Sequence, residues 1–274
     1  MEENIVIYKA SDFTYPTKEE LEFASKLIPN LHTFEYEYIS DIEALTCSDS
    51  ELKLIFKKNH LFCWNLYLRN KIGKFQFAYT NSITYYKRGI PSKDDNQDSK
   101  LYINLIQFYF YSETFYYFLI SVRDIILQII NVYFDLGFEE DKVSQDKIIT
   151  RLGDQPVAII LRKYKTQLKN YSDIRHSLTH RFSVNEPDYR FISRKKTYEP
   201  SNNIFEKIKR SITEKFRENN PNTNNVTSHT LEEFGLGAGS HKGKEPNEIY
   251  DDMINACGIM SNFIQELKTM MIPI

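Results

Sequence analysis

The chain has 274 residues, 41% of them hydrophobic, and a formal net charge of −2. A hydrophobic fraction of this size is enough for a sizeable core and excludes an intrinsically disordered protein. Three distant cysteines, Cys47, Cys63 and Cys257, give neither a disulfide framework nor a CxxC metal site, and the acidic first residues do not have the pattern of a secretory signal. We therefore expect a reducing, cytoplasmic environment.

Residues 1–98 predict a small α+β extension at the N-terminus. Residues 4–9 have the composition of a short strand, and Thr17 is followed by glutamates typical of the first turn of a helix. The apolar spacing of residues 51–70 predicts a second helix. The polar stretch 93–100 then marks the boundary of this extension.

The last part of the extension carries a different pattern. After Gly73, aromatic residues alternate with smaller or polar ones from Phe75 to Thr80, and a second apolar stretch, 83–86, follows an Asn-Ser pair. Strict alternation is typical of a strand with one buried face. The sequence therefore predicts a β-hairpin here, attached to a helical body.

Residues 99–274 predict an all-α helical bundle. A stretch at 101–136 has neither Pro nor Gly and is apolar on most sides, as expected for a helix inside a bundle. Helical spacing recurs at 157–178 and at 247–270. The region between them, at about 185–247, is rich in polar residues towards its end and is expected to be a flexible insertion.

The predicted helix 101–136 carries one polar stripe, with either of two explanations. The stripe is a solvent-facing edge, or it lines a cleft of the bundle that faces the segment from Arg175 to His180. Its members, spaced by three or four residues, are Glu113, Tyr117, Ser121, Asp124, Gln128, Asn131 and Asp135. Arg123 lies on the apolar side, where a carboxylate or a phosphate should meet it. Charged residues interrupt the apolar run, so we do not expect a membrane span.

The segment from Arg175 to His180, Arg-His-Ser-Leu-Thr-His, concentrates the most chemistry in the chain. Gly153-Asp154-Gln155-Pro156 predicts a helix start upstream, with Asp154 as its cap. The helix either continues into the segment or restarts near residues 170–173. On one helix, Arg175 and His180 lie about 140° apart, which lets them flank a phosphate. Arginine binds phosphate oxygens through two parallel hydrogen bonds, and histidine transfers protons near neutral pH.

This arrangement resembles the Arg-x(4-6)-His motif of the HEPN superfamily, helical domains whose active members are mostly metal-independent ribonucleases in toxin and antiviral systems. Arg175 matches the motif arginine, His180 the motif histidine, and His176 the polar position after the arginine. The resemblance implies a homodimer in which two protomers bring their motifs together. Phe182 stands where a subset of the family has a tyrosine modified by a partner, so that mode of control is not expected.

Charge is distributed unevenly along the sequence. Residues 162–217 contain 15 Lys and Arg against six Asp and Glu, whereas residues 1–60 contain six basic and twelve acidic residues. A basic block around the motif is the expected footprint of a polyanion site, or else a solvated surface. Its interleaved basic and aromatic residues suit RNA. The predicted RNA-binding residues are Arg181, Arg190, Arg194, Lys195 and Lys196.

Other chemistries fit the sequence poorly. Residues 235–244 are glycine-rich, but their spacing is not that of a phosphate-binding loop. His176 and His180 have the spacing of a zinc pair, but the residue after His176 is Ser177 rather than the glutamate of a zinc protease. No Gly-x-Ser-x-Gly motif is present. We therefore expect neither a metal nor a cofactor.

Our prediction is a metal-independent endoribonuclease, a toxin or antiviral effector that cleaves RNA. Arg175 is expected to clamp the scissile phosphate and His180 to act as acid or base. His176 and Thr179 are predicted to support them, and Asp124, or else Glu113 or Asp173, to orient the histidine. The alternative is a non-catalytic module that binds RNA or nucleotides, or a regulator that depends on a partner such as an antitoxin.

Overall fold

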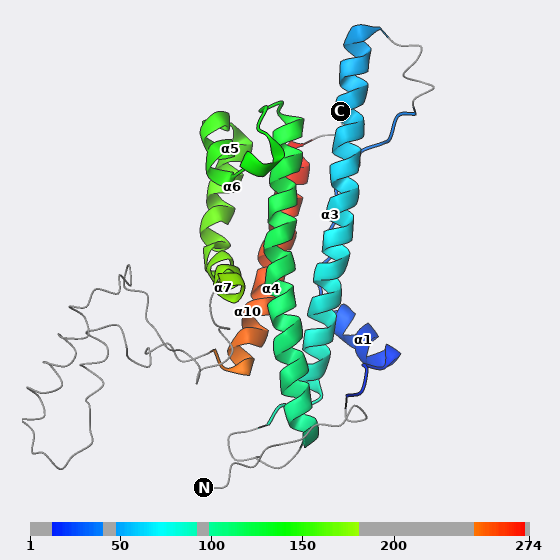
Figure 1. Cartoon of the computed structure of the whole chain (residues 1–274), viewed down its shortest axis with the longest axis vertical. Helices are drawn as coiled ribbons and strands as arrows, with labels where there is room; N and C mark the ends of the chain where they lie inside the picture. The colour runs from blue at the N-terminus through cyan, green and yellow to red at the C-terminus, as the bar shows by residue number, and fades with distance from the viewer. Residues whose placement is uncertain (1–12, 41–47, 92–98, 181–243, 272–274) are drawn as a thin grey trace, which may run out of the picture. The chain divides into compact units, whose positions relative to one another are not determined.

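The computed structural model describes residues 13–40, 48–91, 99–180 and 244–271, and within them every regular element is helical (Figure 1). The elements are α1 (Lys18–Ser25), α3 (Asp49–Lys87), α4 (Ser99–Tyr133), a 3₁₀ turn η2 (Glu140–Lys142), α5 (Gln145–Leu152), α6 (Pro156–Gln167), α7 (Lys169–His180) and α10 (Pro246–Met270). The chain divides into two units, Met1–Thr179 with Pro246–Ile274 and His180–Glu245, and the helices are described within the first. The predicted all-α class is confirmed for the described residues.

The two longest helices, α3 and α4, run antiparallel and share the most extensive interface between elements (Figure 1). At one end of the pair, the Lys57 ammonium lies 2.5 Å from the Asp135 carboxylate. At the other end, the Ser82 hydroxyl donates to the Phe108 carbonyl over 3.3 Å. Large aromatic rings fill the space between these ends, and two of them, on Phe75 and Phe115, stack with centroids 4.8 Å apart.

The β-hairpin predicted after Gly73 is wrong, because these residues lie inside α3. Residues at intervals of four and three along α3 are buried, which is the repeat of a helix packed along one seam. They are Leu61, Asn65, Leu68, Ile72, Phe75, Tyr79 and Ser82. This repeat covers more than twenty residues and outweighs the six-residue alternation that predicted a strand. The described residues therefore give no support to an α+β extension, and the predicted strand at 4–9 lies outside them.

α4 forms the centre of the bundle and begins and ends near the predicted bounds. It is long and apolar enough to cross a membrane by length and composition, but most of its apolar stretch is buried inside the protein, as in a core helix. The helix ends at Tyr133, three residues before the predicted end. Asp135 takes a left-handed conformation with φ of 50°, and the Leu136 N–H returns to the Asn131 carbonyl over 3.0 Å. This is a Schellman-type helix end, in which asparagine or aspartate is tolerated.

α10 packs against α6, α4 and α3 and closes the bundle, as the periodicity at 247–270 predicted (Figure 1). Its buried residues are Ile249, Met253, Ala256, Cys257, Met260, Phe263, Ile264 and Leu267. α6 begins at Pro156 as predicted, but its cap is Gln155. Asp154 instead lies exposed, 3.9 Å from Arg162, because the chain turns into the helix one residue later than expected.

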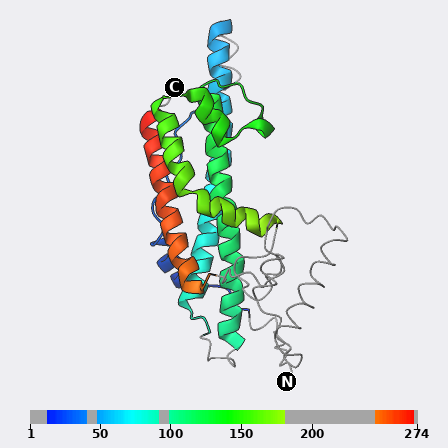
Figure 2. The ribbon, with the colours of Figure 1, turned by 90° about the vertical axis from the view of Figure 1, so that its left-hand side faces the viewer.

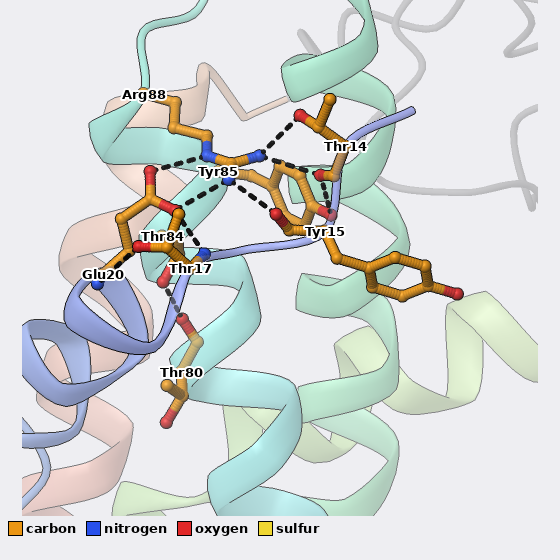
Figure 3. A network of polar contacts seen from close by, with 8 residues as sticks. All are labelled: Thr14, Tyr15, Thr17, Glu20, Thr80, Thr84, Tyr85 and Arg88. Carbon is orange, nitrogen blue, oxygen red and sulfur yellow. Dashed lines mark hydrogen bonds and ion pairs between the residues drawn. The ribbon is translucent and has the colours of Figure 1, made fainter. Parts of the chain in front are cut away.

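Arg88, just past the end of α3, holds the segment before α1 in place (Figure 3). Its guanidinium donates to both carboxylate oxygens of Glu20, over 2.8 and 2.7 Å, and to the main-chain carbonyls of Thr14 and Tyr15. The hydrogen bonds from Arg88 lower the pKa of Glu20 to about 2. Glu20 also closes a capping box with Thr17, which confirms the predicted helix start.

Candidate active site

The predicted motif lies on a helix of its own, α7, which turns away from α6 (Figure 2). Of the two alternatives, a continuous helix and a restart before the motif, the structure has the restart, but it falls at Leu168, so residues 170–173 are inside α7. Tyr171 and Ile174 are buried and face the bundle. Ile174, one residue before Arg175, therefore anchors the motif to the bundle.

Tyr171 connects α7 to two other helices. Its ring stacks on that of Tyr116 of α4, with centroids 6.1 Å apart, and its hydroxyl accepts a hydrogen bond from the Asn255 amide of α10 over 2.9 Å. Burial raises the pKa of both tyrosines, so both hydroxyls stay protonated near neutral pH. These residues therefore fix the position of α7 on the bundle and do not supply acid–base chemistry.

Arg175 projects from the next turn of α7 towards α4. Its guanidinium carbon lies 5.5 Å from the centroid of the Tyr117 ring. Arg175 is half-buried, and Tyr117 is 42% exposed. This contact uses the π face of the guanidinium, and the Nε of Arg175 is buried. The arrangement thus presents a positioned cation at the surface of the bundle.

Of the other predicted motif residues, the structure describes the side chain of His176 but not those of Thr179 and His180. His176 is exposed on α7 next to Arg175. Thr179 and His180 are in the last turn of the same helix, but their side chains lie outside the described residues. One continuous helix, α7, carries both Arg175 and His180.

Asp124 lies elsewhere on α4, seven residues and about 10 Å along the helix from Tyr117. Its carboxylate accepts two hydrogen bonds from Arg123, over 3.0 and 2.7 Å. The prediction that a carboxylate or a phosphate meets Arg123 is therefore confirmed. The carboxylate is that of Asp124, the next residue in the chain. Asp173, the other candidate carboxylate on α7, forms an exposed pair with Lys169 at 2.8 Å. The supporting role of Asp124 stays a prediction.

The polar stripe of α4 has two uses along its length. Near the end of the helix it is structural, because Gln128 donates to the Glu140 carbonyl, and Asn131 both donates to and accepts from the main chain of Phe138. Further back, Tyr117 faces the motif helix. Neither explanation holds for the whole stripe, because Asn131 is buried and hydrogen-bonded to the main chain, whereas Tyr117 is exposed beside the motif helix.

Tyr117 is the site residue that sequence reasoning did not single out. The available signal was an aromatic ring within a polar stripe.

The predicted RNA-binding residues lie outside the described residues, as does Phe182. They are Arg181, Arg190, Arg194, Lys195 and Lys196.

A family model described as Cthe2314-like HEPN matches residues 64–234, which is more than half of the chain. The protein therefore belongs to this HEPN family, and the resemblance seen in the motif is confirmed. The match begins within α3 and so includes the second half of that helix. Comparison with curated proteins and with solved structures gives no significant match.

Proposed function

We propose that this protein is a metal-independent endoribonuclease of the HEPN type, acting as a toxin or antiviral effector in the cytoplasm. The observation that carries the proposal is the position of Arg175, held over Tyr117 on a helix that also contains His176 and His180. A guanidinium and imidazoles on one helix supply the charge stabilisation and the proton transfers that metal-independent phosphodiester cleavage uses.

In the proposed reaction, an imidazole takes the proton from a ribose 2′-hydroxyl, and the resulting oxygen attacks the adjacent phosphorus. The bond from phosphorus to the 5′-oxygen breaks, and that oxygen receives a proton from a second imidazole. Arg175 stabilises the negative charge that grows on the phosphate oxygens. His180 is the proposed base or acid, and His176 and Thr179 support it.

One imidazole does not readily make both proton transfers. We therefore include a homodimer in the proposal, with Arg175 and His180 contributed twice. RNA is the proposed partner molecule, held by Arg181 and by the basic residues from Arg190 to Lys196. An antitoxin or another defence protein is the proposed regulator.

The test is incubation of the full-length protein with end-labelled RNA in EDTA. We expect cleavage by the wild type, with products ending in a 2′,3′-cyclic phosphate, and loss of cleavage in Arg175→Ala and in His180→Ala at an unchanged unfolding midpoint. Lys169→Ala, an exposed change on the same helix, is the matched control and should cleave normally. Binding without cleavage in the wild type would instead favour a non-catalytic RNA-binding module.

A further inference from the structure

A groove lies between α3 and α4 on a side where α10 contributes no lining residue. Its volume is about 510 Å³, within the range of roughly 300–1,000 Å³ typical of ligand sites. The groove is lined by Asn70, Gly73, Lys74 and Phe77 of α3 and by Phe110, Tyr111, Thr114 and Phe118 of α4. We call it the α3–α4 groove. Two of its rings are unusually open to solvent, because Phe77 is 61% exposed and Phe110 is 59% exposed.

Lysines border the aromatic rings of this groove. The ammonium groups of Lys71 and Lys74 lie 5.5 and 6.0 Å from the centroid of the Phe118 ring. Phe118 in turn meets Tyr117 edge to face, with centroids 5.4 Å apart, and Tyr117 lies below the guanidinium of Arg175. A continuous series of rings and cations therefore connects the groove to the candidate active site.

The charge of α3 favours a polyanion as the occupant of the groove. From Leu52 to Lys87 the helix carries seven lysines and arginines and no acidic residue. Trp64 and Tyr67, with centroids 5.8 Å apart, continue the face that carries Lys71 and Lys74 at helical spacing. A negatively charged protein partner would also suit the lysines, but open aromatic rings among lysines are what unpaired bases and their phosphates require together.

We infer that the α3–α4 groove binds single-stranded RNA, with bases stacked on Phe77 and Phe110 and phosphates contacted by Lys71 and Lys74. The inference rests on the proposed function and narrows its substrate class to unpaired RNA, because the bases of a duplex are already stacked and cannot reach these rings. The strand would then pass Tyr117 to reach Arg175.

The experiment measures binding of the full-length protein to a fluorescent oligouridine and to a duplex of equal length. We expect Phe77→Ala with Phe110→Ala to weaken oligouridine binding roughly tenfold or more and to leave duplex binding unchanged. Phe110→Trp, which retains a ring, should bind normally. The matched control is Phe23→Ala on α1, since Phe23 is 56% exposed and lies outside the groove. Lys71→Gln with Lys74→Gln should reduce the slope of log affinity against log salt by about 0.7 per lysine.

Both rings are mostly exposed, so the unfolding midpoint should change little, and Phe110→Trp, which keeps a ring, separates a loss of stacking from a loss of packing against Tyr111. Wild-type affinity in the double phenylalanine variant would overturn the inference, as would equal losses for oligouridine and duplex or an effect of the same size in Phe23→Ala. If RNA cleavage is lost in Arg175→Ala but unchanged in the groove variants, the inference about the groove is wrong and the proposed function stands. If the groove variants weaken RNA binding but the wild type does not cleave RNA, the binding site is supported and the proposed nuclease activity is wrong.

Discussion

Arg88 and Arg175 are two arginines of one fold that are held in different ways. Arg88 donates to both oxygens of a carboxylate and to main-chain carbonyls, and its side chain is only 16% exposed. Arg175 is half-buried, and its guanidinium lies over the face of the Tyr117 ring. The first arrangement uses the hydrogen-bonding edge to fix the chain, whereas the second uses the flat face to position the cation. The same residue type therefore predicts stability at one place and chemistry at the other.

The largest expected effect is at Arg175. Arg175→Lys keeps the charge but not the planar fork, so we expect RNA cleavage to fall roughly 10²- to 10³-fold. The free energy of unfolding should stay within about 0.5 kcal/mol of the wild type. The matched control is Arg88→Lys, which should lower stability but leave the rate per folded molecule unchanged. Equal effects of the two changes on cleavage would contradict the comparison.

The next effect is on stability. Arg88→Ala removes charge-assisted hydrogen bonds from a largely covered side chain, and we expect it to lower the free energy of unfolding by about 2 kcal/mol. Glu20→Gln retains the capping-box pattern with Thr17, so it separates the ion pair from the cap. Denaturant unfolding of the two single variants and the double variant should show a coupling of about 1 kcal/mol. Additive losses would mean that the pair does not stabilise the protein.

The same pair predicts a dependence on pH. The pKa of Glu20 is lowered from 4.5 to about 2, so its contribution is fully present above pH 4.5 and is lost as the pH falls towards 2. After allowance for the partial exposure of Glu20, we expect the wild type to lose about 1–2 kcal/mol more than Glu20→Gln over this range. Unfolding measured at pH 7, 4.5 and 2.5 checks this, and parallel curves for the two proteins would refute it.

The smallest effect is at Tyr117. Tyr117→Leu removes the ring below Arg175, and a lost cation–π contact of about 0.5–1 kcal/mol should reduce cleavage roughly two- to fivefold. Tyr117→Phe keeps the ring and should cleave like the wild type. A strong loss in the phenylalanine variant would assign a role to the hydroxyl instead of the ring.

Local patterns predicted α10 and the start of α1 well, because helical spacing and glutamates in a first helical turn depend on residues close in sequence. The strand pattern at Phe75–Thr80 failed because a six-residue alternation is a weaker signal than the repeat that continues from Leu61 to Ser82. At the site, Arg175 was predicted from its own motif. Tyr117 was not, because its contact with Arg175 depends on how α4 and α7 pack, which no local pattern contains.

The antiparallel pairing of α3 and α4 also has a consequence for folding. These helices follow one another in the sequence, so their contacts need only a short loop to close and should form early and quickly. α10 follows α7 in the sequence only after residues 181–245, so its contacts with α4 and α6 are long-range and should form later than those between α3 and α4.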